Sequence, residues 1–184
     1  MTVGTKPVDM TLGIVGGGQL GRMMALAGAP LGVHCVVLDP SAEACARHVA
    51  RHIQAPFDDV DAVQSLADQV SVATFEFENV PAESLARLAD HLPAFPPAQA
   101  LAISSDRWYE KSLFHELGID LPPVAVVDSQ ADLDQAVSEL GLPAVVKTRT
   151  LGYDGKGQKV MRTAADAVGA WEALGESPVY WKGL

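Results

Sequence analysis

The sequence predicts an α/β protein in which a parallel-sheet domain is followed by a smaller α+β unit. In the first part of the chain, short apolar runs alternate with stretches of helical spacing, a pattern typical of a parallel sheet with helices on both faces. The proline-rich segment PAFPP, at residues 93–97, interrupts this alternation, and a different pattern follows it. We therefore place the first domain at residues 1–96 and the second at residues 97–184.

The first domain is expected to contain four strands and three main helices. The apolar, β-rich runs that predict the strands lie at residues 11–15, 33–38, 52–55 and 72–77. The expected helices lie at residues 19–27, 42–51 and 60–69. In the first of these helices, helical spacing places Leu20, Met23, Met24 and Ala27 on one face.

Beyond the proline-rich segment, helices and strands alternate at shorter intervals. A charged helix is expected at residues 106–117, with Gly118 as its C-cap. A strand at 124–127 and a helix at 132–140 follow. The apolar run at 143–146 ends in Lys147, and further short strands are expected at 160–161 and 179–181.

Composition indicates a soluble cytoplasmic protein. Hydrophobic residues make up 48% of the 184 residues, which excludes a disordered chain, and the net charge of −10 argues against nucleic-acid and membrane-surface partners. No apolar run approaches the ~20 residues that span a bilayer, and residues 1–10 do not resemble a signal peptide. Cys35 and Cys45 are isolated, so neither a disulfide framework nor a thiolate metal site is expected. The five histidines show no metal-ligand spacing.

The stretch VVKTRTLGYDGKGQ, at residues 145–158, reads as a strand, a glycine-rich loop and a second strand. Lys147 supplies a positive charge, and the glycines allow backbone N–H groups to approach phosphate oxygens. The stretch is not a Walker A sequence, because no Gly-Lys-Ser/Thr opens a helix. A β-hairpin with a glycine turn and a solvated lysine is the alternative interpretation.

Gly16, Gly18 and Gly21 form G-x-G-x-x-G between a strand and a helix, and Asp39 ends the next strand. This arrangement fits a Rossmann domain that binds NAD or FAD. A glycine turn at a helix N-terminus also presents N–H groups to a sugar monophosphate. Tight packing between strand and helix is the structural alternative.

Two carboxylates, Glu76 and Glu78, lie in the stretch FEFEN that ends the fourth strand. Strand alternation places them on one face and Phe75 and Phe77 on the other. At the carboxyl end of a sheet strand they are positioned to accept hydrogen bonds from an amine or from ribose hydroxyls, with a solvated strand end as the alternative.

Arg107 opens the charged helix, and Lys111 lies one turn further on. Arg107 and Lys147 would converge on one phosphate chain if this helix packs against the second sheet. The alternative pairs Arg107 with Asp106 or Glu110 at the surface.

Together, these motifs resemble the ATP-grasp family, and within it the enzymes that carboxylate aminoimidazole ribonucleotide in purine biosynthesis. The resemblance is carried by GIVGGGQLGRMM, VLDP, TFEFENVP, SSDRWYEK and VVKTRTLGYDGKGQ, which span residues 12–158. It implies a pre-ATP-grasp, Rossmann-like domain that binds the ribonucleotide rather than NAD, followed by the first, α+β part of an ATP-grasp domain. The implied reaction uses ATP and bicarbonate to form carboxyphosphate, which then carboxylates the exocyclic amine.

The resemblance also assigns roles to individual residues. Binding of the ATP phosphates is implied for Arg107, Lys147, Gly152, Tyr153, Asp154, Gly155, Lys156, Gly157 and Gln158. Ribonucleotide binding is implied for Gly18, Gln19, Leu20, Glu76 and Glu78, and a catalytic position facing the amine for Tyr153, Asp154 and Lys156. A homodimer is one assembly that the resemblance allows.

The family extends for about as many residues again beyond this point, and its Mg²⁺ ligands lie there. No metal ligand is therefore expected among these 184 residues, and we expect a truncated chain that is inactive alone. Lys182 stands where the family usually has an acidic residue. Two alternative functions are a non-catalytic ribonucleotide-binding module and, more remotely, an NAD-dependent Rossmann oxidoreductase.

Overall fold

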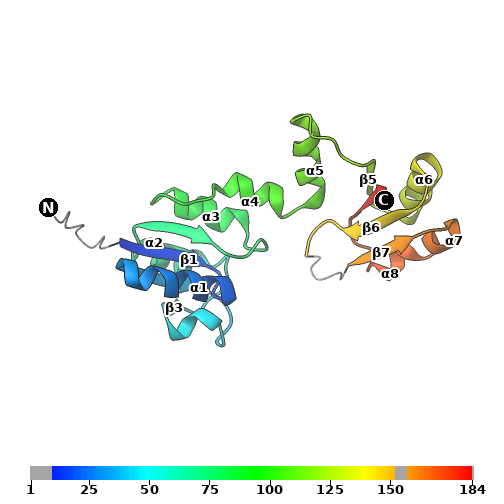
Figure 1. Cartoon of the computed structure of the whole chain (residues 1–184). Helices are drawn as coiled ribbons and strands as arrows, with labels where there is room; N and C mark the ends of the chain where they lie inside the picture. The colour runs from blue at the N-terminus through cyan, green and yellow to red at the C-terminus, as the bar shows by residue number, and fades with distance from the viewer. Residues whose placement is uncertain (1–9, 152–156, 184) are drawn as a thin grey trace. The chain divides into compact units, whose positions relative to one another are not determined.

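The computed structural model describes residues 10–151 and 157–183 of the chain. It divides into two compact units, Met1–Ala102 and Ile103–Leu184, so the division falls six residues beyond the expected end of the first domain. Figure 1 shows the elements of each unit. Among the described residues, no helix is both long and apolar enough to cross a membrane.

The first unit is built on a parallel sheet with strand order β3-β2-β1-β4. Its strands are β1 (Met10–Val15), β2 (Val33–Leu38), β3 (Arg51–Ile53) and β4 (Val72–Phe75). Val15 is in register with Leu38 on one side and with Phe75 on the other. The carboxyl ends of β1, β2 and β4 therefore meet at one edge of the sheet, where open α/β folds bind their ligands.

Helices cover both faces of this sheet, as the alternating sequence pattern predicts. On one face, α1 (Gln19–Gly28) and the 3₁₀ helix η2 (Cys45–His48) pack on Ile14 and Val37. The opposite face of the sheet is covered by α2 (Val60–Ala67) and α3 (Ala82–Ala89), joined by the buried Leu101 of α4 (Ala98–Ser104). A short 3₁₀ helix, η1 (Ala29–Leu31), follows α1.

Three sequence-based predictions for this unit need correction. The helix expected at 42–51 is reduced to η2, and its last residue begins β3, because Arg51 pairs with Val36 of β2. The fourth strand ends at Phe75 rather than at residue 77. The helix α4, absent from the expectations, occupies the segment directly after the prolines.

The second unit holds an antiparallel sheet with strand order β5-β8-β6-β7. Its strands are β5 (Val124–Val127), β6 (Ala144–Thr148), β7 (Gln158–Met161) and β8 (Val179–Gly183). The helices are α5 (Arg107–Glu116), α6 (Gln130–Leu140), α7 (Ala164–Ala167) and α8 (Ala170–Ala173). The antiparallel sheet and its helices confirm the α+β class expected for this part of the chain.

One face of this second sheet forms the core of the unit. Val146 and Trp181 point into a cluster completed by Leu133 of α6, Ala167 of α7 and Ala170 of α8. Because side chains alternate along a strand, the neighbouring residues Val145, Lys147, Tyr180 and Lys182 lie on the other face.

Candidate functional site

Where β1 leads into α1, two positions favour glycine: Gly16 in the loop and Gly21 in the first turn of the helix. Gly16 has a φ of 107°, a conformation that residues with a side chain rarely adopt. A Cβ atom on Gly21 would lie 2.7 Å from the carbonyl oxygen of Gly16. The first turn of α1 therefore lies directly against the end of β1, as the glycine fingerprint predicts.

Two carboxylates of the protein itself accept hydrogen bonds from backbone N–H groups of this loop. The Gly17 N–H donates to Asp39 Oδ2 at 2.7 Å, and the Gly18 N–H donates to Glu76 Oε1 at 2.8 Å. Asp39 Oδ1 also accepts the Ser41 N–H. Both acidic residues follow strands adjacent to β1, so the parallel sheet brings them to the glycines.

This arrangement narrows what the glycine loop can bind. A dinucleotide pyrophosphate at Gly17 and Gly18 would meet two carboxylates that already hold those N–H groups, so the geometry disfavours NAD. Within the described part of the chain, the N–H groups of Gln19, Leu20 and Gly21 have no acceptor. These donors open α1, where the helix dipole favours an anion, and Glu76 lies beside them.

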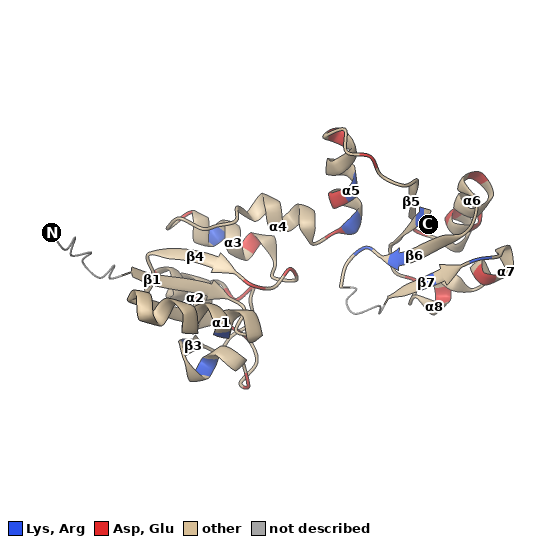
Figure 2. Ribbon diagram, viewed as in Figure 1, with Lys and Arg blue, Asp and Glu red and all other residues tan. Residues whose placement is uncertain are grey.

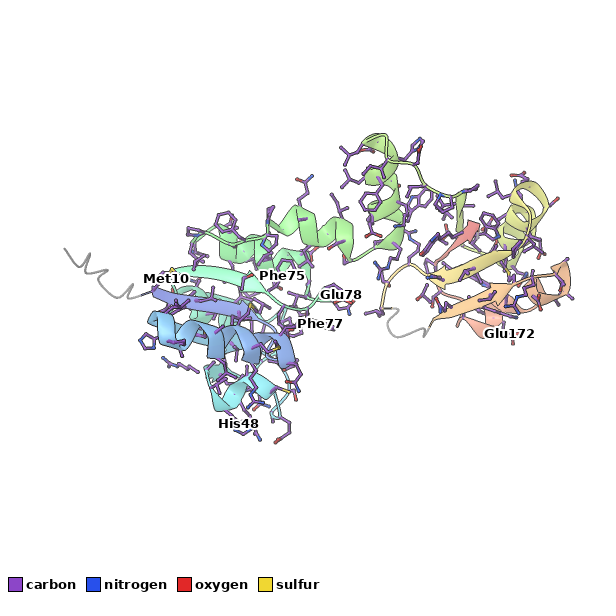
Figure 3. The ribbon with its side chains drawn as sticks, viewed as in Figure 1. Met10, His48, Phe75, Phe77, Glu78 and Glu172 are labelled. Atoms are coloured by element: carbon purple, nitrogen blue, oxygen red, sulfur yellow. The ribbon has the colours of Figure 1, made fainter. Side chains whose placement is uncertain are left out.

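The structure separates the two glutamates that the sequence placed on one face. Because β4 ends at Phe75, strand alternation no longer governs the residues that follow. Glu76 is half-buried, and its carboxylate accepts from the glycine loop. Glu78 is exposed further along the turn (Figure 3). Phe77 lies beside Phe57, with ring centroids 6.5 Å apart. Of the two glutamates, only Glu76 has a hydrogen bond to the glycine loop among the described residues.

Lys147 lies near the end of β6, on the face of the second sheet that points away from the core. It is in register with Tyr180 of β8 and with Gln158 of β7. Residues 144–147 thus pair antiparallel with residues 158–161, as the glycine-rich stretch predicts.

The backbone N–H of Arg107 donates to the Arg149 carbonyl at 2.9 Å, which places the start of α5 at the end of β6, two residues beyond Lys147. Burial raises the pKa of the Tyr180 hydroxyl, the positive charge of Arg107 lowers it, and Glu110 raises it. Tyr180 is the cross-strand neighbour of Lys147. Figure 2 shows basic positions on both α5 and β6. Arg107 also lies 3.8 Å from Glu110, which matches one of the surface pairings considered for it.

An ion pair between Asp106 and Arg149 was missed at the level of sequence. Arg149 Nη2 lies 2.7 Å from Asp106 Oδ2, and Arg149 Nε lies 3.1 Å from Asp106 Oδ1. The bond to Asp106 is the main cause of the raised pKa of Arg149. The two residues line a cavity of about 450 Å³ together with Thr148, Thr150, Leu151, Gly157, Ser177 and Pro178. A separation of 43 residues left no local signal for this pairing.

Gly157 closes the described part of the glycine-rich loop. Its φ is 66°, its carbonyl oxygen accepts the Thr148 N–H at 2.8 Å, and an added Cβ would lie 2.5 Å from Thr148 Oγ1. The other predicted loop residues, Gly152, Tyr153, Asp154, Gly155 and Lys156, lie outside the described residues.

The described residues offer no metal centre. No group of three or more His, Cys, Asp or Glu side chains is gathered among residues 10–151 and 157–183 in a way that would hold a metal ion. The described residues therefore do not fit Mg²⁺ by themselves.

Comparison with protein families assigns both units. A family model described as the ribonucleotide synthetase preATP-grasp domain matches residues 9–105. The chain belongs to this family. A second model, described as the ATP-grasp domain, matches residues 112–182, so the ribonucleotide synthetase preATP-grasp unit is followed by an ATP-grasp unit. Both the resemblance and the fold class inferred from sequence are thereby confirmed.

Several relatives of this chain are named as carboxyaminoimidazole ribonucleotide synthases. The N5-carboxyaminoimidazole ribonucleotide synthase of Pseudomonas aeruginosa is 55% identical over 175 residues, which cover 95% of this chain and 49% of that enzyme. The N5-carboxyaminoimidazole synthetase from Staphylococcus aureus, solved with ADP, superposes with a TM-score of 0.91 at 38% identity, covering 95% of this chain and 47% of that one.

The synthase from Aspergillus clavatus, solved in complex with ADP and 5-aminoimidazole ribonucleotide, has a TM-score of 0.85 at 26% identity. That match covers 95% of this chain and 46% of the fungal one. The chain spans about half the length of the curated relatives it matches.

Proposed function

We propose that this chain takes part in the ATP- and bicarbonate-dependent carboxylation of 5-aminoimidazole ribonucleotide. ATP would phosphorylate bicarbonate to carboxyphosphate, and attack by the exocyclic amine would then yield the N-carboxylated ribonucleotide and phosphate. The observation that carries the proposal is the glycine loop held by Glu76, within a unit of the ribonucleotide synthetase preATP-grasp family.

The first unit would bind the ribonucleotide. Its phosphate would accept from the free N–H groups at the start of α1, at Gln19 and Leu20. Glu76 Oε1 already accepts the Gly18 N–H, so its second oxygen is available to accept from the exocyclic amine. The carboxylate would thus orient the amine while the helix dipole favours the phosphate.

The second unit would bind ATP on the face of its sheet that points away from the core around Trp181. Lys147 and Arg107 provide two positive charges there, and phosphoryl transfer depends mainly on positioning and on neutralising phosphate charge. Gly157 and Gln158 would extend this site toward the loop. The roles of Tyr153, Asp154 and Lys156 as groups facing the amine stay sequence-based predictions, as do a homodimer and a cytoplasmic location.

Calorimetric titration tests the ribonucleotide site. We expect Glu76→Gln to weaken aminoimidazole ribonucleotide binding by at least tenfold, because the amide loses the charge that orients the amine. Glu78→Gln is the matched control and should bind as the unmodified chain does. Equal affinities for the two variants would contradict the assignment of Glu76.

A second titration tests the ATP site. Lys147→Ala should reduce ATP affinity at least tenfold, whereas Lys159→Ala, which removes a lysine in register with Val146 rather than with Tyr180, should not. Ribonucleotide binding without any ATP binding would instead favour a non-catalytic ribonucleotide-binding module.

A further inference from the structure

The Asp106–Arg149 ion pair is the most enclosed ion pair among the described residues. The side chains are 14% and 17% exposed, respectively, and the guanidinium binds both carboxylate oxygens. The other face of Arg149 lies over the Tyr109 ring, with the guanidinium carbon 5.5 Å from the ring centroid. Arg149 is thus held from two sides and its charge is neutralised, which makes it a poor candidate for a direct phosphate ligand.

Backbone hydrogen bonds of Arg149 and a side-chain hydrogen bond of Asp106 connect three segments of the second unit. The Arg107 N–H donates to the Arg149 carbonyl at 2.9 Å, and the Arg149 N–H donates to the Pro178 carbonyl at 3.1 Å. Asp106 Oδ1 also accepts the Trp108 N–H at 2.8 Å and so caps α5. The start of α5, the end of β6 and the residue before β8 therefore meet at Arg149.

The two cations assigned to the ATP phosphates flank this junction. Arg107 follows Asp106 directly, and Lys147 precedes Arg149 by two residues. Both side chains are positively charged and do not attract each other, so their relative position depends on how α5 is attached to β6. Among the described residues, the attachment includes the Asp106–Arg149 pair, the backbone bond from Arg107 to Arg149 and the contact of Arg149 with the Tyr109 ring.

We propose that Asp106 and Arg149 are positioning residues whose ion pair holds Arg107 on α5 in place relative to Lys147 on β6, so that both cations reach one phosphate chain. The inference rests on the proposed ATP-binding function. It adds two residues that would not touch the nucleotide but would determine how tightly its phosphates are held.

Three substitutions in the full chain separate geometry from charge. Arg149→Gln removes the charge and one of the two parallel bonds, and Arg149→Lys keeps the charge but cannot form the two-point contact. Asp106→Asn keeps an acceptor for the α5 cap while removing the negative charge. Arg162→Gln is the control, because it removes an exposed arginine from the same unit.

Calorimetry with ATP, and separately with aminoimidazole ribonucleotide, measures the effect. We expect Arg149→Gln and Asp106→Asn each to weaken ATP binding at least tenfold. Because the two residues act as one unit, the double variant should bind ATP no less tightly than the single variant with the lower affinity. The logarithm of the ATP dissociation constant of Arg149→Lys should lie closer to the value for Arg149→Gln than to the value for the unmodified chain. Ribonucleotide affinity and the Arg162→Gln control should stay within twofold of the unmodified chain.

Amide hydrogen exchange without nucleotide supplies a readout that does not depend on ATP. In Arg149→Gln, the amides of Arg107 and Trp108 should exchange at least tenfold faster, while those of α6 and β5 stay unchanged. Unchanged exchange at Arg107 would overturn the inference. Faster exchange with unaltered ATP affinity would also overturn it, because the pair would then stabilise the fold without positioning the cations.

The lysine variant keeps the inference separable from the function on which it rests. If Lys147→Ala lowers ATP affinity and Arg149→Gln does not, the positioning role is wrong and the ATP site stands. If the unmodified chain does not bind ATP, the proposed ATP-binding function fails, and the positioning role fails with it.

Discussion

The glycine loop of the first unit shows how individual residues select a ligand. Gly16 and Gly18 leave space for the Glu76 side chain, because a Cβ atom on either glycine would lie within 3 Å of it. Asp39 closes the other side of the loop by accepting from Gly17. With these N–H groups occupied, the remaining donors suit one phosphate at the helix start rather than a pyrophosphate along the loop.

We expect Gly21→Ala to lower the free energy of unfolding. The new Cβ would lie 2.7 Å from the Gly16 carbonyl oxygen, a backbone atom that cannot rotate away. Overpacking of this kind costs about 1–3 kcal/mol, which exceeds the gain of about 1 kcal/mol in helix propensity. Urea denaturation measures the change.

The control for this prediction is Ala27→Gly, on the exposed side of α1, which should cost only the propensity difference of about 1 kcal/mol. An increase in stability for Gly21→Ala would show that the helix can shift away from β1.

The two cysteines should differ in reactivity. Burial raises the pKa of the Cys35 thiol above its ordinary value, and the side chain is only 9% exposed, whereas Cys45 is half-buried. We expect iodoacetamide at pH 8 to modify Cys45 well before Cys35, as followed by mass spectrometry, because the thiolate is the reactive form.

The raised pKa of Cys35 also makes the free energy of unfolding decrease as the pH rises into the alkaline range. The folded chain keeps this proton to a higher pH than the unfolded chain, so its contribution is complete below the unfolded pKa and declines as the pH rises through the folded one. Cys35→Ala should flatten that alkaline decline.

Equal labelling rates for the two thiols in the native protein would show that Cys35 is more accessible than its burial indicates.

At the scale of elements, α1 packs through small residues. Gly21 and Ala25 are its buried positions, while Leu20 and Met23 are 57% and 62% exposed. The helix lies so close to β1 that only small side chains fit between them, as the 2.7 Å approach at Gly21 shows. Hydrophobic spacing alone predicted this helix correctly but did not indicate which of its faces packs on the sheet.

The cap of α2 offers a test at the same scale. Asp59 Oδ1 accepts the Ala62 N–H at 2.9 Å, so Asp59→Ala leaves that donor of the first turn without its partner. We expect a loss of about 0.5–2 kcal/mol in the free energy of unfolding, measured by urea denaturation. Asp58→Ala, which removes the same charge from the adjacent exposed position, should change stability by less than about 0.5 kcal/mol.

At the scale of the whole molecule, the hydrophobic clusters respect the division into two units. The clusters around Val15 and Ile14 draw only on residues of Met1–Ala102, and the cluster around Trp181 draws only on residues of Ile103–Leu184. Each unit therefore has its own core, and each carries one of the two proposed binding sites.

Separate cores predict separate responses to core substitutions. Leu85→Ala in the first unit and Leu133→Ala in the second remove fully buried side chains, and each should cost about 2–5 kcal/mol within its own unit. Hydrogen exchange measured by mass spectrometry should show faster exchange in residues 10–102 for the first variant and in residues 103–183 for the second. Loss of protection in both units from either variant would show that they unfold together.

The fold class, the glycine turn after β1 and the strand pair on either side of the glycine-rich stretch could all be predicted from local patterns. Alternation of apolar runs and glycines that require positive φ act over a few residues, so they can be read along the chain. The choice of Glu76 over Glu78 and the Asp106–Arg149 pair could not be predicted in this way. Each depends on where a strand ends or on a contact across 43 or 58 residues, which exists only once sheets bring distant segments together.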